Sequence, residues 1–204
     1  GLERAERILS ISESTKRDLV ERWGVAPERV QVIHEGVDGT MFIPLPKDAL
    51  AAVRAQYRLP ARFLLMVGPF DPWCDPRWTL EALARLPSHL SDVGLVMAGP
   101  RGSLYEDAQR RAAELGLSRR LTWLGYVPQA DLVGAYNLAE ALMFASGTEG
   151  FGLPVLEAMS CGTPVVTSRS GALPEVAGEA ALLVDYDSVE QLAAAMTQVL
   201  DDGA

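Results

Sequence analysis

The sequence predicts an α/β fold of the Rossmann-like kind, a parallel sheet with helices on both faces. Short apolar runs suited to buried strands alternate along the chain with amphipathic segments suited to helices. Glycine-rich turns follow several of these runs, as is common where a strand leads into a helix. The chain has 204 residues, 49% of them apolar, which is enough to fill one main core.

The elements follow from these patterns in order. We expect strands at residues 7–12, 30–33, 63–67, 93–98, 120–124, 141–145 and 164–168. We expect helices at residues 14–23, 50–57, 79–85, 104–115, 129–137, from Pro154 onward, and 188–200. Ser14 and Ser188 are the predicted N-caps of the first and last helices, and Gly116 ends the fourth. Residues 39–47, with two prolines, form the only linker-like stretch.

Charge and composition exclude several classes of protein. The formal net charge of −9 and a pI near 4.7 argue against a nucleic-acid partner, because phosphate neutralisation needs clustered Lys and Arg. No apolar run approaches the roughly 18 residues of a membrane span, and no signal-peptide pattern opens the chain. Two cysteines and two histidines show neither a disulfide framework nor zinc spacing, so a cytoplasmic location is expected.

The most informative segment is residues 149–157, in which Glu149 and Glu157 flank a glycine-rich turn running into a helix. The turn follows the predicted strand 141–145, and ligands bind at the carboxyl edge of open parallel sheets. Pro154 suits the first helical position. The backbone N–H groups of Phe151, Gly152 and Leu153 would then point toward an anion such as a phosphate.

The residues around these amides have separate expected tasks. Gly150 and Gly152 let the backbone approach a ligand closely. Glu149, on the loop, can accept hydrogen bonds from sugar hydroxyls, and Glu157, in the first helical turn, can reach a vicinal diol such as ribose. The alternative for Glu157 is that it only complements the helix dipole.

Residues 149–157 resemble the donor-sugar motif of retaining glycosyltransferases of family 4, which have the two-domain GT-B architecture. The resemblance continues through residues 157–167, 171–178 and 180–185. Upstream, residues 7–20 and 32–38 resemble the segments that cross from the amino-terminal domain into the carboxyl-terminal one. Nearly the whole chain is covered.

The resemblance implies a domain organisation. Residues 1–45 would be the end of the N-terminal domain and the crossover segment, and residues 46–204 the nucleotide-sugar donor-binding domain. The acceptor domain is expected to be largely absent, so this chain alone should bind a donor without transferring it. The full-length protein would be cytoplasmic, with a peripheral position at the inner membrane face left open.

The resemblance also implies a reaction. A hexose would move from a nucleotide diphosphate sugar, GDP- or UDP-linked, to a hydroxyl of an acceptor glycan or lipid-linked glycan, with retention at the anomeric carbon. Mannose on GDP is the family-level expectation. Glu149 would be the catalytic residue that positions the sugar, Glu157 would bind the ribose, and no metal or other cofactor is expected.

Three further loops should line the same cleft. The first begins at Gly68, where the family usually carries an Arg and a Lys that clamp the diphosphate; here Trp73 and Cys74 stand at those positions. Arg77 is the nearest cation. It could replace the clamp if the loop is rearranged, or it could be an exposed residue that only caps the surface of a helix. This departure motivates the competing hypothesis, a degenerate and non-catalytic nucleotide-sugar binding or interaction module.

The second loop, residues 99–103, offers Arg101 as another phosphate partner, although glycine-rich turns of this length are common. The third, residues 125–128, resembles the family's base-binding turn, in which backbone near Tyr126 and Val127 reads the nucleobase; the alternative is an ordinary strand-to-helix turn. A third class of protein, the dinucleotide-dependent oxidoreductases, is not favoured, because this sequence lacks their G-x-G-x-x-G fingerprint.

The remaining conspicuous residues have structural explanations. Trp23, Trp78 and Trp123 fall at apolar-face spacings and are expected in the core. His34 is expected to be a turn or packing residue, and Glu175 to close a hydrogen-bonded turn. Trp73, in the first cleft loop, is the aromatic residue expected near a ligand.

Overall fold

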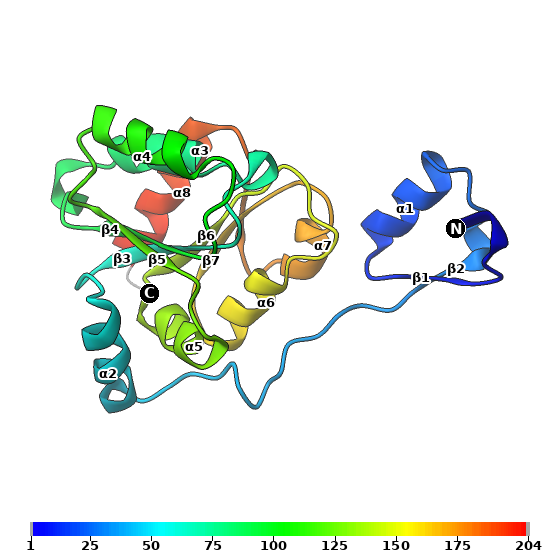
Figure 1. Ribbon diagram of the computed structural model, residues 1–204, viewed down its shortest axis with the longest axis horizontal. Helices are drawn as coiled ribbons and strands as arrows, with labels where there is room; N and C mark the ends of the chain where they lie inside the picture. The colour runs from blue at the N-terminus through cyan, green and yellow to red at the C-terminus, as the bar shows by residue number, and fades with distance from the viewer. Residues whose placement is uncertain (1, 203–204) are drawn as a thin grey trace.

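The computed structural model describes residues 2–202, apart from the side chain of Lys47. Its main body is a parallel six-stranded sheet in the order β5-β4-β3-β6-β7-β8 (Figure 1). The strands are β3 (Phe63–Val67), β4 (Gly94–Ala98), β5 (Leu121–Gly125), β6 (Ala141–Phe144), β7 (Val165–Ser168) and β8 (Leu182–Val184). The predicted fold class is confirmed.

Helices cover both faces of this sheet (Figure 1). One face carries α3 (Pro76–Ala84), α4 (Tyr105–Glu114) and α8 (Val189–Asp201). The other carries α2 (Lys47–Tyr57), α5 (Gln129–Leu138), α6 (Leu153–Ser160) and α7 (Leu173–Ala177). Short 3₁₀ turns occur at Leu2–Arg4, Pro27–Arg29, Pro72–Cys74 and Ser88–Leu90.

The strand sequences explain the two layers. Successive side chains of a strand point to opposite faces. In β3, Leu64 and Met66 therefore join the core under α3 and α8, whereas Phe63 and Leu65 join the core under α5 and α6. All four are at most 1% exposed, so a strand buried on both faces needs the continuous apolar run seen in the sequence.

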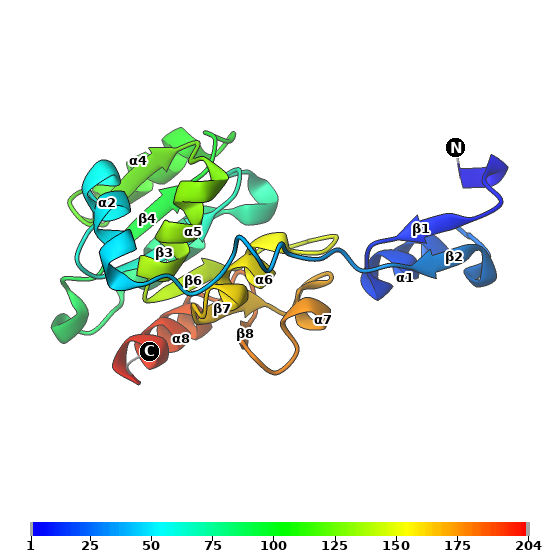
Figure 2. The same ribbon diagram turned by 90° about the horizontal axis from the view of Figure 1, so that it is seen from below.

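An N-terminal segment stands beside this body and contains a two-stranded parallel sheet (Figure 2). It comprises β1 (Ile8–Ser10), α1 (Glu13–Glu21) and β2 (Val30–Val32). The predicted cap at Ser14 is wrong: Ser12 caps α1, because its side chain accepts a hydrogen bond from the Thr15 amide. Trp23 is 70% exposed, so its predicted place in the core is also wrong.

A connecting segment, residues 33–46, joins the two parts along the face that carries α5 and α6 (Figures 1 and 2). It is attached at several points. Phe42 is 2% exposed and packs edge-on against Tyr136, with ring centroids 6.1 Å apart. The side chain of Asn137 accepts from the Leu45 amide at 2.7 Å and donates to the Ile43 carbonyl at 3.0 Å.

Two elements go beyond the predicted set, β8 and the short helix α7. Both lie in the region 171–185, whose turns obscure the periodicity. The cap at Ser188 is confirmed, since its side chain accepts from the Gln191 amide. Trp78 and Trp123 pack partly buried against the core, as expected. Within residues 2–202, no helix has the length and apolarity that crossing a bilayer demands.

Candidate functional site

The strand order reverses between β3 and β6, which are neighbours in the sheet. The chain moves from β3 outward to β4 and β5, then returns to the opposite side of β3 to form β6. Such a reversal is where ligands bind in open α/β sheets. The loops after the two strands are joined: the Gly147 amide and the Ser146 hydroxyl both donate to the Trp73 carbonyl at 2.7 Å.

The loop after β6 presents unused hydrogen-bond donors. Gly152 caps α6 with φ +105°, and a Cβ there would lie 2.6 Å from Leu173 Cδ2, so glycine is required. Among the described residues, the amides of Phe151, Gly152 and Leu153 have no hydrogen-bond partner. Gly150 has more room, because its Cβ would meet only ordinary contacts with Ile11 and Thr15. The predicted amides therefore lie together at the start of α6, where a helix favours an anion.

Glu149 stands at the beginning of this loop. Its backbone carbonyl accepts a hydrogen bond from the Ala172 amide at 3.0 Å, which fixes the loop against the segment leading to α7. Its side chain is partly buried, and burial raises the pKa of the carboxyl above its usual value. Glu149 also lies near the buried thiol of Cys74 from the β3 loop, since its charge raises the pKa of that thiol.

Glu157 is the fifth residue of α6, so its predicted place in the first helical turn is wrong; the helix begins at Leu153 and Pro154 is its second residue. The carboxylate is held from α5, because the hydroxyl of Tyr136 donates to Glu157 Oε2 at 2.7 Å. Burial raises the pKa of Glu157, as it does for Glu149. The side chain therefore has a fixed buried partner, which a helix-dipole role would not need.

The other cleft loops meet at an apolar hollow of about 180 Å³. Gly68 donates to the Ala98 carbonyl at 3.0 Å and Gly99 to the Gly125 carbonyl at 2.8 Å, so the three loops are in contact. A Cβ on Gly99 would lie 2.1 Å from the Gly68 carbonyl oxygen. The hollow is lined by Val67, Gly68, Pro69, Ala98, Gly99, Pro100, Tyr126, Val127 and Leu132. The predicted base-binding residues thus lie together around it.

Tyr126 and Val127 play different parts there. Tyr126 is 79% exposed, which leaves its ring free to cover a flat ligand, whereas Val127 is buried and forms part of the wall.

The two candidate phosphate cations are already engaged. Arg77 forms a bidentate pair with Asp75, with Nε at 2.9 Å from Oδ1 and Nη2 at 2.6 Å from Oδ2. The guanidinium of Arg101 lies over the ring of Tyr105, 4.4 Å from its centroid. Arg101 lines a small separate hollow with Gly99 and Gly125. Neither side chain makes a contact with the start of α6 among the described residues.

Trp73 and Cys74, which stand where the family carries its basic pair, differ sharply in burial. The Trp73 side chain is 48% exposed at the cleft, whereas Cys74 is 3% exposed. Burial raises the pKa of the Cys74 thiol to about 12, so it stays protonated. Only the first of the two positions presents its side chain to a ligand.

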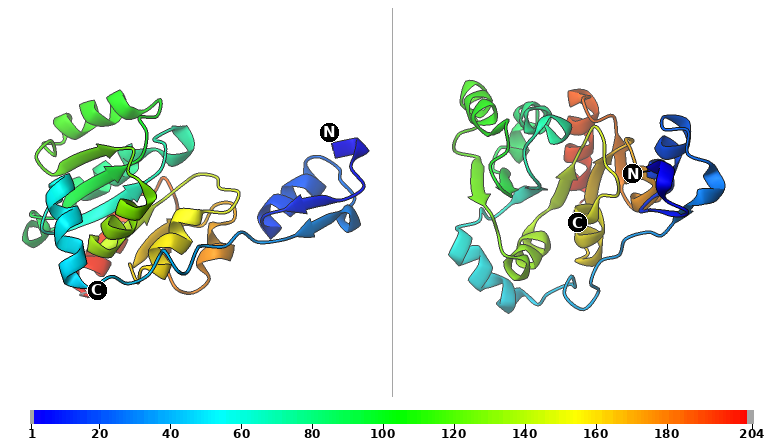
Figure 3. Two further views of the ribbon diagram at one scale, coloured as in Figure 1. Left: turned by 60° about the horizontal axis from the view of Figure 1, so that its bottom comes forward. Right: turned by 45° about the vertical axis from the view of Figure 1, so that its right-hand side comes forward.

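Two residues beside the site were assigned smaller roles from the sequence. Glu175 accepts hydrogen bonds from the amides of Glu13 and Ser14 at 2.9 and 3.2 Å and from His34 Nε2 at 2.6 Å. The ribbon views show the N-terminal segment on the side of the main body that carries α7 (Figure 3). The ring of His34 lies 6.2 Å from that of Phe151. Tyr136 could not be identified from the sequence as a partner of Glu157, because Glu157 lies on the next helix. These pairs join distant parts of the chain, which local patterns do not report.

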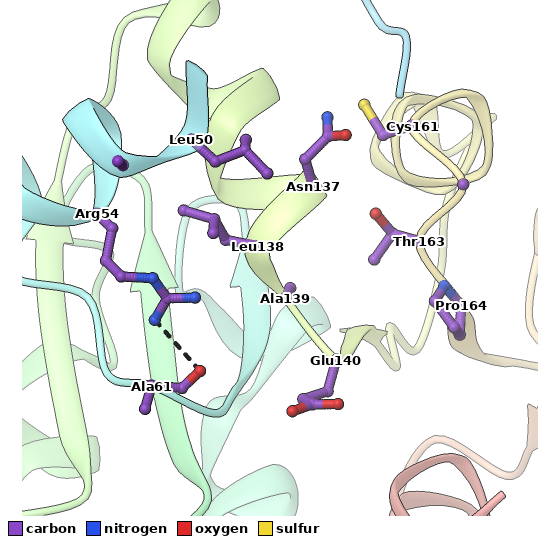
Figure 4. Close-up of a pocket in the computed structure, with 12 residues that line it drawn as sticks. Leu50, Arg54, Ala61, Asn137, Leu138, Ala139, Glu140, Cys161, Thr163 and Pro164 are labelled. Carbon is purple, nitrogen blue, oxygen red and sulfur yellow. Dashed lines mark hydrogen bonds between the residues drawn. The ribbon is translucent and has the colours of Figure 1, made fainter. Parts of the chain in front are cut away.

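A second cavity, of about 570 Å³, lies at the opposite edge of the sheet (Figure 4). It is lined by Leu50 and Arg54 of α2, Asn137 at the end of α5, and Cys161 and Thr163 after α6. This is the amino edge of β6 and β7. It lies away from the glutamates and the free amides, and ligands of such sheets bind at the carboxyl edge. Size alone therefore does not identify the site.

Metal ligation is a separate question. Within residues 2–202, no three His, Cys, Asp or Glu side chains are grouped so that they could hold a metal ion. The expectation that no metal is needed stays a prediction.

Comparison with known proteins agrees with this arrangement. Residues 52–204 match the family model described as glycosyl transferases group 1, and residues 1–40 match the model described as glycosyltransferase family 4. The chain is 33% identical over 205 residues to the O-antigen chain mannosyltransferase B of Escherichia coli, covering 99% of this chain and 53% of that protein. It is 34% identical over 207 residues to the D-inositol 3-phosphate glycosyltransferase of Mycolicibacterium smegmatis, covering 98% and 46%.

Solved structures give the same picture of the fold. HepE of Anabaena, in complex with UDP and glucose, superposes with a TM-score of 0.89 at 21% identity, covering 98% of this chain and 55% of that one. A sucrose-phosphate synthase of Thermosynechococcus elongatus superposes with a TM-score of 0.84 at 29% identity, covering 98% and 50%. The chain spans about half the length of the curated relatives it matches. It belongs to the group 1 glycosyl transferases and has the fold of the carboxyl-terminal half of a GT-B glycosyltransferase.

Proposed function

We propose that this chain is the donor-binding portion of a retaining family 4 hexosyltransferase that uses a nucleotide diphosphate sugar. The observation that carries the proposal is the start of α6, where three unpartnered amides, of Phe151, Gly152 and Leu153, lie between the partly buried Glu149 and Glu157. Amides at a helix start stabilise the negative charge that develops on a departing diphosphate. Because they are fixed before the ligand arrives, they need no reorganisation during the reaction.

The flanking residues would divide the donor between them. Glu149 would position the transferred hexose, Glu157 the ribose, and the hollow beside Tyr126 and Val127 the base. The acceptor, a glycan or lipid-linked glycan, would be bound by the part of the protein that precedes this chain. The name of the O-antigen chain mannosyltransferase supports a mannosyl donor, and the UDP complexes of HepE support uridine donors; a GDP-linked mannose stays our proposal. We propose that the diphosphate is bound without metal.

Titration calorimetry of the chain with GDP, UDP and ADP and their sugar conjugates tests this proposal. We expect nucleotides of one base to bind, and we expect Glu157→Ala to weaken their affinity at least about tenfold. The control is Glu179→Ala, which removes an exposed carboxylate on the loop after α7 and should leave the affinity unchanged. Chelation with EDTA should not alter the binding heat. Absence of binding by any nucleotide, in a sample shown to be folded by circular dichroism, would reject the donor site.

A second candidate function, a non-catalytic nucleotide-sugar module, is favoured by the engaged cations. Arg77 is paired with Asp75 and Arg101 lies over Tyr105, so neither is aimed at the amides of α6. Comparing a nucleoside monophosphate with its diphosphate separates the two functions. A working donor site should prefer the diphosphate at least about tenfold, because its second phosphate gains charge-assisted hydrogen bonds. Equal affinity would favour the non-catalytic module.

A further inference from the structure

Trp73 is a large apolar side chain that, within residues 2–202, packs into neither of the two cores under the helices. Its side chain is 48% exposed, on the short turn that follows β3. By contrast, Trp78 and Trp123 pack against the core under α3 and α8. Aromatic surface left in water forgoes the free energy of burial, which a ligand that covers the ring would recover.

The backbone that carries Trp73 is fixed from two sides. Its carbonyl accepts from the Ser146 hydroxyl and from the Gly147 amide, both at 2.7 Å. Two residues earlier, the Asp71 carboxylate accepts from the amide and the hydroxyl of Ser103 at 2.8 and 2.6 Å. The turn is therefore tied to the loop after β6 and to the loop after β4. A side chain presented by such a backbone loses little freedom when a ligand binds.

The same contacts bring Trp73 next to Glu149. Burial raises the pKa of the Glu149 carboxyl, and hydrogen bonding with the Ser146 hydroxyl partly offsets this effect. Ser146 is therefore in contact with both the Trp73 carbonyl and the Glu149 side chain. The next residue of the turn, Cys74, also lies close enough for the charge of Glu149 to act on its thiol. Trp73 is thus beside the carboxylate to which the proposed function assigns the transferred hexose.

The surroundings of Trp73 suit an uncharged ligand better than a phosphate. Asp75, two residues further on, is buried and already occupies the guanidinium of Arg77. A Cβ on Gly147 would lie 3.2 Å from Tyr186 Cε2, so a second aromatic ring packs on the glycine that is bonded to Trp73. Aromatic faces fit the C–H groups of a pyranose ring, and carboxylate oxygens accept from its hydroxyls.

We propose that Trp73 is a specificity-determining residue whose indole packs against the C–H face of the transferred hexose, while Glu149 accepts from the hydroxyls of that sugar. This position then contributes affinity for the sugar and not for the diphosphate. The substrate class is a nucleotide sugar whose hexose offers one apolar face. The inference rests on the proposed function and adds the group that recognises the sugar.

The test is calorimetry with two pairs of ligands, GDP-mannose with GDP and UDP-glucose with UDP, of which the pair that binds is used. Trp73→Ala should weaken the nucleotide sugar roughly threefold to tenfold, the usual contribution of an aromatic contact. It should leave the affinity for the nucleoside diphosphate unchanged, because that ligand has no sugar to place on the indole. Trp73→Phe, which keeps a ring, should retain part of the difference.

Trp23→Ala is the matched control, because Trp23 is 70% exposed on the N-terminal segment, outside the main body. It should change neither affinity. If Trp73→Ala weakens both ligands equally, or weakens neither, the inference is overturned while the donor site stands. Should Trp73→Ala not fold, the indole N–H resonance of Trp73 must shift more with the nucleotide sugar than with the nucleoside diphosphate, and equal shifts overturn the inference. If the unmodified chain binds no nucleotide, the proposed function fails and the inference with it.

Discussion

The carboxylate of Glu175 accepts a hydrogen bond from Nε2 of His34 at 2.6 Å, although 141 residues separate them in the chain. The same carboxylate accepts from the amides of Glu13 and Ser14 and so serves as an external cap for α1. Together with the hydrogen bond from the Thr15 hydroxyl to the Gly150 carbonyl, it attaches the N-terminal segment to the part of the main body that contains the loop after β6 and α7. This attachment lies next to the free amides of α6.

Removing the Glu175 carboxylate should loosen the first turn of α1. We expect Glu175→Ala to lower the free energy of local opening there by roughly 0.5–2 kcal/mol, the usual cost of losing a helix cap, with little added by the half-exposed ion pair. Hydrogen exchange of the Glu13 and Ser14 amides measures this change. Glu179→Ala is the control, and equal protection in both variants would contradict the assignment.

The same contact should fail in acid. Burial disfavours the charge on Glu175, but the amides of Glu13 and Ser14 and the His34 ring outweigh it and hold the pKa of this carboxyl below its usual value. A lowered folded pKa means that the stabilisation is fully present above the unfolded pKa of about 4.3 and is lost as pH falls through the folded value. Amide chemical shifts of residues 13 and 14 should therefore titrate below about pH 4.3. A midpoint above it would count against the contact.

Gly152→Ala should destabilise the fold and weaken nucleotide binding together. The added Cβ would meet Leu173 Cδ2 at 2.6 Å in a backbone with φ +105°, and we expect a loss of about 1–3 kcal/mol in the free energy of unfolding. Gly116→Ala is the matched control, because its φ is +72° with nothing within 4 Å of the new Cβ. Denaturant unfolding and calorimetry should show both variants strained but only Gly152→Ala defective in binding.

Introducing a cation at the two positions of the missing clamp should have opposite effects. Trp73→Arg should fold normally, because the Trp73 side chain is half-exposed and its carbonyl makes the contacts with Ser146 and Gly147. It should bind diphosphate more tightly, in a salt-dependent way. Cys74→Lys places a charge at a residue that is only 3% exposed, and it should lower the free energy of unfolding by more than about 3 kcal/mol. Thermal melts and calorimetry check both, and a stable Cys74→Lys variant would show that the loop moves.

Much of the fold could be predicted because strands buried on both faces and amphipathic helices leave local signals. The run from Phe63 to Val67 was predicted with its observed bounds. The glycine-rich turn at 149–153 was likewise identified as the beginning of a helix. The cap of α1 was misplaced by two residues, since Ser12 and Ser14 are equally good caps in sequence and only the backbone geometry chooses between them.

The parts of the site that could not be predicted depend on tertiary contacts. Nothing local to Tyr136 indicates that its hydroxyl will meet Glu157, which lies on the next helix. Trp23 looked like a core residue because apolarity was its only signal, yet no described element covers it. Side-chain identity indicates what chemistry is available, whereas the pairing that engages or frees it is decided by the packing of distant segments.

The packing contacts of the connecting segment determine where this molecule can bend. Val37, Phe42 and Leu45 pack against the core shared by α5 and α6, so the chain from residue 37 onward is fixed to the main body. Among the described residues, the hydrogen bonds that hold the N-terminal segment to the main body are those to Glu175 and the one to Gly150. A swing of that segment would therefore pivot just before Val37 and would break the contacts at Gly150 and Glu175 without disturbing Phe42, Tyr136 or the hydrogen bond that holds Glu157.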